Sequence, residues 1–330
     1  MPEITRSLAV DGTFRPEAVN FLGNIPDKAL FHVQHGLRHP ESLYQFSLDN
    51  VAAAFTKVAE AYLSKTSEYR DRRSGAFDLS DLLHYQESFL HAAREHVDDC
   101  YLILKTLVDP AATRKSSRFA EEFVIDNRLA GAKAFQQSME SYKKTFLILN
   151  KLKHQQGRLR GISIWTEAGA HIGYFLEEPD SEGRLGPSPE LHPDQGAISF
   201  ARDLPWHMFN IYRCSNRLVE AIRKALVAIY GVTIRPKIAA DDDLWRNVVR
   251  LAEALPPRIF SKEVPKKVAT FRRSDHDTVL VIRFPIASLR SLQKRESSGK
   301  AKGRQILAGY CQYRRDQFPS GTCYGQSRSL

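Results

Sequence analysis

The chain has 330 residues, of which 42% are hydrophobic and 26% are charged, as in a soluble globular protein with one large domain or two smaller ones. No run of about 18 apolar residues is present, so we expect no membrane-spanning helix. The N-terminal segment MPEITRSLAVDG has no basic stretch followed by an apolar one, so we expect no signal peptide and a cytoplasmic protein.

Apolar residues recur at three- and four-residue steps over most of the first 230 residues, which predicts a mainly α fold. Residues 1–40 show little periodicity. The predicted helices run about 41–66, about 81–108 with Ser80 as N-cap, about 118–153 with an interruption near 126–131, and about 204–230 with Asp203 as cap and Gly231 as end.

Alternating apolar residues predict strands elsewhere in the chain. GISIW and HIGYFLE form a predicted hairpin, and residues 178–197 form a predicted long loop that is rich in Pro and Gly. Past Gly231 we expect a short helix at about 242–255 and a second hairpin from the runs 268–271 and 279–284. The predicted organisation is an irregular segment at 1–40, a helical bundle at 41–231 with a hairpin and loop insertion at about 160–200, and a smaller, basic, mixed α+β region at 232–330.

Four cysteines, Cys100, Cys214, Cys311 and Cys323, occur without a CxxC pair. Cys100 and Cys214 lie among apolar residues in helical patterns, which predicts buried free thiols in a reducing compartment. The sequence contains no phosphate-cradling glycine loop, and no pattern in it predicts a metal ion or a cofactor.

The formal net charge of +10 attracts polyanions such as RNA, but it also fits a solubilising surface. Cations are frequent in the last third of the chain, where Lys266, Lys267, Arg272 and Arg273 are candidate RNA-binding residues. The same pattern is typical of a solvated basic tail, and the sequence alone leaves both interpretations open.

The predicted helix at 81–108 also carries a polar stripe made of His84, Glu87, His91, Glu95 and Asp98. Steps of three and four residues place these side chains on one helical face. A solvated face with i,i+4 pairs accounts for the stripe, and so does a row of acids and imidazoles near a catalytic site. A di-iron bundle is not predicted, because Glu87 and His91 are four residues apart rather than three.

The stretch SYKKTFLILNKLKHQQGRLR, residues 141–160, holds the best candidates for chemistry. It is a predicted helix end in which the imidazole of His154 and the amide of Asn150 lie among four cations, Lys151, Lys153, Arg158 and Arg160. A neutral imidazole can remove the proton of a 2′-hydroxyl, and lysine or arginine can stabilise a pentacoordinate phosphate. The set therefore predicts metal-free RNA cleavage, with a histidine that only caps the helix end as the alternative.

The segment LNKLKH, together with the earlier helix EHVDDCYLILK, resembles the HEPN superfamily of helical domains. The family's motif is an Arg, then four to six residues and a His, usually with a polar residue such as Asn directly after the Arg. Asn150 and His154 match the polar residue and the His, whereas Leu149 occupies the position of the Arg. The likeness covers about residues 41–230.

The resemblance implies a HEPN-like bundle that forms a homodimer, with both copies of His154 in one cleft. Catalytic members of the family cut RNA without a metal ion and leave a cyclic phosphate. They occur in toxin–antitoxin, phage-defence and RNA-processing systems, which also implies a regulatory protein partner. An acidic residue on a neighbouring helix often supports the site, and Glu95, Asp98 and Asp99 are candidates for that role.

The resemblance thus predicts an endoribonuclease in which four residues are catalytic: Asn150, Lys151, His154 and Asp98. Lys153, Arg158 and Arg160 join the four C-terminal cations as RNA-binding residues. Family members without the Arg are frequently non-catalytic. Because Leu149 occupies that position, the alternative prediction is a non-catalytic module for RNA binding or dimerisation. A protein-interaction scaffold without a nucleic-acid partner is a third hypothesis.

Overall fold

The computed structural model describes residues 3–7, 13–71, 78–154, 157–166, 169–192, 196–237, 243–263, 270–273 and 280–285. They belong to one compact unit, Met1–Ile286, and the second unit, Ala287–Leu330, lies outside the described residues. The described part is mostly helical and contains smaller antiparallel sheets, so the mainly α prediction is confirmed at that level.

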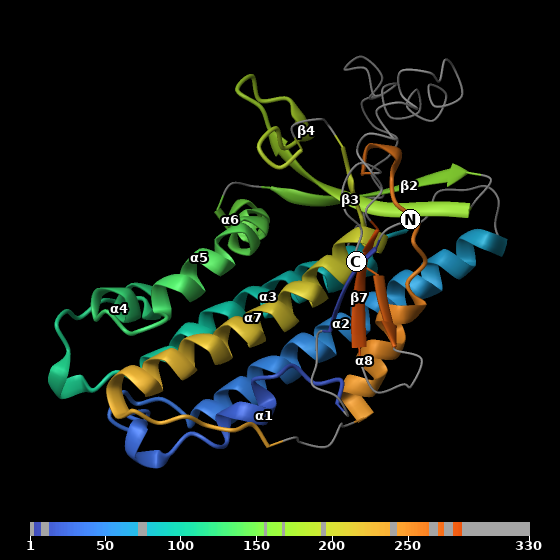
Figure 1. Ribbon diagram of the computed structural model, residues 1–330. Helices are drawn as coiled ribbons and strands as arrows, with labels where there is room; N and C mark the ends of the chain where they lie inside the picture. Colours follow the sequence, from blue (N-terminus) through green and yellow to red (C-terminus); the bar gives the residue numbers. More distant parts are fainter. Residues whose placement is uncertain are drawn as a thin grey trace, which may run out of the picture. The chain divides into compact units, whose positions relative to one another are not determined.

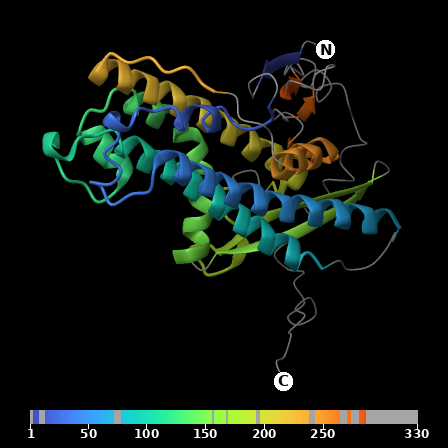
Figure 2. The same ribbon diagram turned by 90° about the horizontal axis from the view of Figure 1, so that it is seen from below.

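Three long helices form the centre of this unit: α2 (Pro40–Asp71), α3 (Ser80–Lys105) and α7 (Phe200–Tyr230). They lie side by side in both views (Figures 1 and 2). Their facing sides are apolar, since Phe55 and Phe89 pack ring to ring at 5.7 Å and Leu218 and Ile222 are fully buried. Each side chain of this size contributes about 1.5–3 kcal/mol when it is buried, so these contacts hold the frame of the site.

The start of α3 differs from the predicted start in its cap. Ser80 is the first helical residue, and its backbone N–H donates to the carboxylate of Asp78 at 2.9 Å. Hydrogen bonds from Ser80 lower the pKa of Asp78. The N-cap residue is therefore Leu79 and not the predicted Ser80, and the Asp78 carboxylate accepts from the first helical N–H near the positive end of the helix dipole.

Shorter helices and turns follow α3: η2 (Pro110–Ala112), α4 (Ala120–Asp126), α5 (Ala132–Lys143), η3 (Lys144–Phe146) and α6 (Leu147–His154). The predicted interruption near 126–131 is confirmed, because Arg128 (φ 56°) and Gly131 (φ 87°) adopt left-handed conformations there. A Cβ atom on Gly131 would lie 2.7 Å from the Cα atom of Ala221. Glycine is therefore required for α5 to approach α7 this closely.

The predicted hairpin is also confirmed. β2 (Arg158–Thr166) pairs antiparallel with β3 (Gly169–Pro179), and the hairpin packs against α2, α3 and α7 (Figure 1). The predicted loop at 178–197 is wrong in part, since β4 (Leu185–Pro187) pairs with the end of β3. A strand of three residues is too short to show the alternation by which strands are recognised in a sequence.

The last strand of this sheet, β5 (Ile198–Ser199), leads directly into α7. Because α7 begins at Phe200, Asp203 is a buried residue of the first turn and not the predicted cap. Gly231 (φ 64°) ends the helix in the left-handed conformation, as predicted. Ile229 is 50% exposed although its spacing predicts a buried side chain, because residues 227–229 in the last turn of α7 are all exposed.

The chain before α2 and the chain after α7 both pack on the bundle. The N-terminal segment contains α1 (Val19–Leu22) and η1 (Asp27–Ala29), and it buries Phe21. After α7, α8 (Asp243–Ala254) packs on α2 and buries Trp245. The compact unit therefore continues past residue 231, where the sequence predicts a boundary.

A second antiparallel sheet contains the predicted hairpin of the basic region. It follows η4 (Ser261–Glu263) and has the strand order β1 (Glu3–Ser7), β7 (Leu280–Pro285), β6 (Thr270–Arg273). The first residues of the chain thus pair with the last described ones. Among the described helices, none is both long enough and apolar enough to cross a membrane.

Candidate functional site

The predicted site residues of α6 divide between two faces of the helix. Asn150, Lys153 and His154 are exposed, whereas Leu149 and Lys151 are buried. The three exposed residues follow one another at steps that keep them on one side of the helix. His154 is therefore open to a substrate from solvent, and Asn150 lies one helical turn before it.

Arg94 of α3 reaches this exposed face of α6. Its Nη1 atom donates to Oδ1 of Asn150 at 2.8 Å, and its Nε atom lies 4.0 Å from Oδ2 of Asp98. Desolvation raises the pKa of the Asp98 carboxyl, and the positive charges of Arg94 and Lys143 partly offset that increase. The site therefore combines a guanidinium and a carboxylate from α3 with an amide and an imidazole from α6.

Leu149, which the predicted resemblance matches to the arginine of the HEPN motif, is 1% exposed. An arginine side chain at this position would enter the core and would not share the exposed face with His154. Arg94 supplies a guanidinium from the other side. Sequence analysis did not identify Arg94, although its steps of three from His91 and four to Asp98 place it on the polar stripe of α3.

Lys151 is a predicted catalytic residue, but the structure separates it from His154. It is 8% exposed, and its Nζ atom lies 2.8 Å from Glu178 Oε2 and 3.0 Å from Glu190 Oε2. The hydrogen bond to Glu178 raises the pKa of Lys151 against the opposing effect of burial. Lys151 thus ties α6 to β3, and a phosphate would have to displace two carboxylates to reach it.

The residues that follow α6 set the start of β2. The backbone N–H of Gly157 donates to the carbonyl oxygen of Lys151 at 3.1 Å, and a Cβ atom on Gly157 would lie 3.1 Å from that oxygen. This close approach favours glycine at position 157. The backbone conformation does not, since Gly157 is not among the residues with positive φ. Arg158 is exposed, whereas Arg160 is partly buried and binds Glu177 through Nε at 2.9 Å and Nη2 at 2.8 Å.

The other predicted residues lie elsewhere. Lys266 and Lys267 fall outside the described residues, and Arg272 and Arg273 lie on β6 opposite Val281 and Leu280 of β7.

The candidate acids of α3 point in different directions. Asp99 is partly buried and forms no ion pair with Arg94 among the described residues, and Glu95 is exposed. Asp98 is the candidate acid that the structure brings to Arg94.

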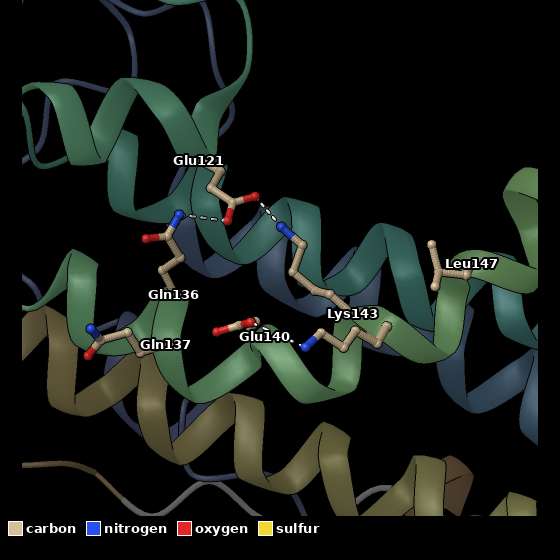
Figure 3. A pocket seen from close by; sticks show the side chains of 7 residues that line it. Glu121, Gln136, Gln137, Glu140, Lys143 and Leu147 are labelled. Carbon is tan, nitrogen blue, oxygen red and sulfur yellow. Dashed lines mark hydrogen bonds and ion pairs between the residues drawn. The ribbon is translucent and has the colours of Figure 1, made fainter. Parts of the chain in front are cut away.

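A pocket of about 390 Å³ opens beside this site, between α4 and α5 (Figure 3). Leu147, at the start of α6, lines it. Lys143 forms an ion pair with Glu121, and Lys144 forms one with Glu140 at 3.4 Å. Because each lysine of the wall already has a carboxylate partner, the pocket has little attraction for a phosphate, and we do not count it as part of the site.

A second polar network, which sequence analysis did not identify, lies in the core. Asp203 Oδ2 accepts hydrogen bonds from Gln86 Nε2 and from the Tyr174 hydroxyl, each at 2.7 Å. Asp203 Oδ1 lies 3.5 Å from His207 Nε2, and His207 Nδ1 lies 3.0 Å from the Tyr142 hydroxyl. Burial acts to raise the pKa of Asp203, but its partners, His207 first, lower it overall. The network joins α3, α5, α7 and β3, and its burial suits a structural role.

Comparisons of the chain with protein-family models, curated proteins and solved structures find no match. The HEPN resemblance therefore depends on the short motif that contains Asn150 and His154.

Proposed function

We propose that this protein is a metal-independent endoribonuclease of HEPN-like organisation, with His154 as the general base. The observation that carries the proposal is the 2.8 Å hydrogen bond from Arg94 to Asn150. It holds a guanidinium on the face where an exposed imidazole lies one turn away, and this pair of groups can move a proton and stabilise a phosphorane. RNA brings its own nucleophile, the 2′-hydroxyl, so the chemistry requires no metal ion.

The proposed reaction is an internal attack within the substrate. His154 takes the proton of a 2′-hydroxyl, and the oxygen attacks the adjacent phosphorus. The bond from phosphorus to the 5′-oxygen breaks, and this oxygen takes a proton from a second, protonated imidazole. In a homodimer His154 of the partner subunit supplies that proton, and the product is a 2′,3′-cyclic phosphate.

The exposed groups around His154 have separate roles in this proposal. Arg94 and Asn150 bind the phosphate that is attacked, and Asp98 orients the Arg94 guanidinium from the opposite side. Lys153 and Arg158 are exposed and bind the neighbouring phosphates. A cation at each flank favours single-stranded RNA that runs along the end of α6.

The predicted residues that are paired with carboxylates take supporting roles. Lys151 fixes α6 through Glu178, and Arg160 fixes β2 through Glu177. Both therefore position the site and do not bind RNA themselves. The biological setting that we propose is a cytoplasmic toxin or phage-defence effector, for which a regulatory partner that covers His154 is a natural control.

The test is cleavage of a labelled RNA by the full chain in excess EDTA, at a temperature at which circular dichroism shows the protein to be folded. His154→Ala should reduce the rate by about 100-fold or more, as expected for the loss of a general base. His84→Ala is the matched control, because it removes an exposed histidine of α3, and it should cut at the wild-type rate. Intact RNA with the wild-type protein, or equal cleavage by His154→Ala, contradicts the proposal.

A second candidate function is RNA binding without cleavage. It is favoured by the burial of Leu149 and by the two carboxylates around Lys151, which together leave fewer cations at the site than a catalytic HEPN motif supplies. This function predicts an RNA affinity that falls by orders of magnitude between about 50 and 200 mM salt, with the RNA left intact. The absence of RNA binding at low salt would leave the protein-interaction scaffold.

A further inference from the structure

Three metal-ligating side chains meet in the core where α3 contacts α7. His96 and Cys100 are one turn apart on α3, which places them on the same face, and α7 brings Cys214 to them. One ring nitrogen of His96 and the two sulfur atoms all lie within 4.8 Å of one another. All three residues are fully buried, so the cluster is closed to solvent.

The spacing of the sulfur atoms suits a shared ion. The Sγ atoms of Cys100 and Cys214 are 3.6 Å apart. Zinc binds thiolate sulfur at about 2.3 Å in tetrahedral sites, which puts two sulfur ligands about 3.8 Å apart. A disulfide would need the two sulfurs to close to about 2.05 Å. The two helices thus hold the thiols near the separation that a tetrahedral ion requires.

The hydrogen bonds of His96 leave one ring nitrogen for a ligand. Nδ1 lies 3.0 Å from the Ser47 hydroxyl. When the Ser47 hydroxyl accepts the hydrogen on Nδ1, the second nitrogen of the neutral ring has no hydrogen. Nε2 then carries a lone pair, and it is buried without a hydrogen-bond partner in the described part of the chain. Metal-bound histidines are typically oriented in this way by a partner on the second nitrogen.

We propose that His96, Cys100 and Cys214 form a structural binding site for one Zn²⁺ ion. Two thiolates and an imidazole are a ligand set that zinc prefers. Tyr44 packs edge-on against the His96 ring, with ring centroids 5.2 Å apart, and its buried hydroxyl interacts electrostatically with Cys100 and Cys214, so this oxygen would be the fourth ligand. The proposal does not depend on RNA cleavage, because these residues lie in the core and not on the exposed face of α6.

The charges of the complex balance. Each bound Zn²⁺ displaces the protons of two thiols, which pass to solvent, and the resulting ZnS₂N unit is neutral. A neutral unit avoids the cost of burying an uncompensated charge. Burial raises the pKa of Cys100 well above its usual range and lowers the pKa of His96 to about 4. Burial therefore favours the uncharged imidazole of His96 and the protonated thiol of Cys100 in the metal-free protein, and metal binding requires the deprotonation of the thiols.

The experiment uses the full chain with Cys311→Ser and Cys323→Ser, so that Cys100 and Cys214 are the only thiols. The reduced, metal-free protein is titrated with Co²⁺, which reports a tetrahedral thiolate site by sulfur-to-cobalt charge-transfer absorption. We expect one equivalent of Co²⁺ to bind, excess Zn²⁺ to bleach the bands, and Zn²⁺ to raise the Tm by several degrees. Free thiols that leave Co²⁺ in its aqueous form, in a folded protein, overturn the proposal.

Variants assign the ligands. Cys214→Ser and His96→Gln should each lose the charge-transfer bands and the rise in Tm, whereas His84→Gln, on the exposed side of α3, should keep both. Bands that persist unchanged in Cys214→Ser overturn the proposal. If a variant fails to fold, the decisive measurement is made on the cysteine-reduced parent chain: Tm with Zn²⁺ against Tm with excess chelator. Equal values for a chain with free Cys100 and Cys214 also overturn it.

Discussion

The exposed end of α6 and the buried contact between α3 and α7 both hold histidines among polar partners, yet they suit opposite tasks. His154 is open to solvent, and one helical turn before it Asn150 binds the partly exposed guanidinium of Arg94. His96 is fully buried, and burial lowers its pKa to about 4, so it stays neutral at physiological pH. Solvent access therefore separates a group that can exchange protons from one that can only act as a ligand or a hydrogen-bond partner.

One helix supplies partners to both places. Arg94 and Asp98 lie on the side of α3 that faces α6, and His96 and Cys100 lie on the side that faces the core. Changes on the buried side should therefore act on the free energy of unfolding. Changes on the exposed side should act on RNA and leave stability nearly unchanged.

The largest expected loss of stability on the buried side follows Asp203→Ala. This change leaves Gln86, Tyr174 and His207 without their shared partner, and the removal of one member of a buried charged network costs about 3–5 kcal/mol. Chemical unfolding at pH 7 measures it. The control is Glu140→Ala, which breaks an exposed ion pair and should change stability by less than about 0.5 kcal/mol. A loss as small as that of the control would contradict a structural role for the network.

The stability that Asp203 contributes should also depend on pH, because its pKa is lowered in the folded protein. The folded-state pKa of Asp203 lies below its unfolded value of about 3.9, so its contribution to stability is complete above pH 4. It is lost as the pH falls through the lower, folded value. The difference between wild type and Asp203→Ala should therefore stay constant from pH 7 to about pH 5 and shrink only below about pH 4.

A smaller effect is expected when Leu149→Arg introduces an arginine at the position where the HEPN motif has one. Because Leu149 is buried, the variant forces a cation into the core, and we expect a loss of about 3 kcal/mol without any gain in RNA cleavage. Leu147→Arg is the matched control on the exposed side of α6, and its stability should be close to that of wild type. A stable Leu149→Arg protein that cuts RNA faster would show that α6 can turn this face toward the substrate.

The smallest effect on stability is expected for Arg94→Ala, because the Arg94 side chain is partly exposed and its pairs are weak. The free energy of unfolding should change by less than about 1 kcal/mol, while RNA cleavage falls by about 100-fold through loss of charge stabilisation. Arg250→Ala is the matched control, since Arg250 forms a similar hydrogen bond to Asn247 on α8. Equal cleavage by Arg94→Ala would remove Arg94 from the site.

Local patterns in the sequence were sufficient for most elements of the fold. The period of apolar residues gave α2, α3 and α7 nearly complete, and alternation gave the β2–β3 hairpin. The short β4 strand and the hydrogen bond from Ser80 to Asp78 at the start of α3 were missed, because a three-residue strand has no period and a single hydrogen bond leaves no pattern in the sequence.

The sites depend on contacts that no local pattern contains. Arg94 and Asn150 are 56 residues apart, and Cys100 and Cys214 are 114 residues apart, so only the packing of the helices brings each pair together. The motif around His154 identified an exposed imidazole, but it could not show that Lys151 lies between two carboxylates of other segments. The sequence therefore could not predict which residues from different helices meet in each site.

The most direct test of the proposed function is cleavage of one RNA oligonucleotide and of its copy with a single 2′-deoxy nucleotide at the cut position, both in EDTA. The account predicts that the wild-type protein cuts the RNA to a 2′,3′-cyclic phosphate, leaves the substituted position intact, and loses the cleavage with His154→Ala. Cleavage at the 2′-deoxy position, or equal cleavage by His154→Ala, would contradict the claim that His154 activates the 2′-hydroxyl.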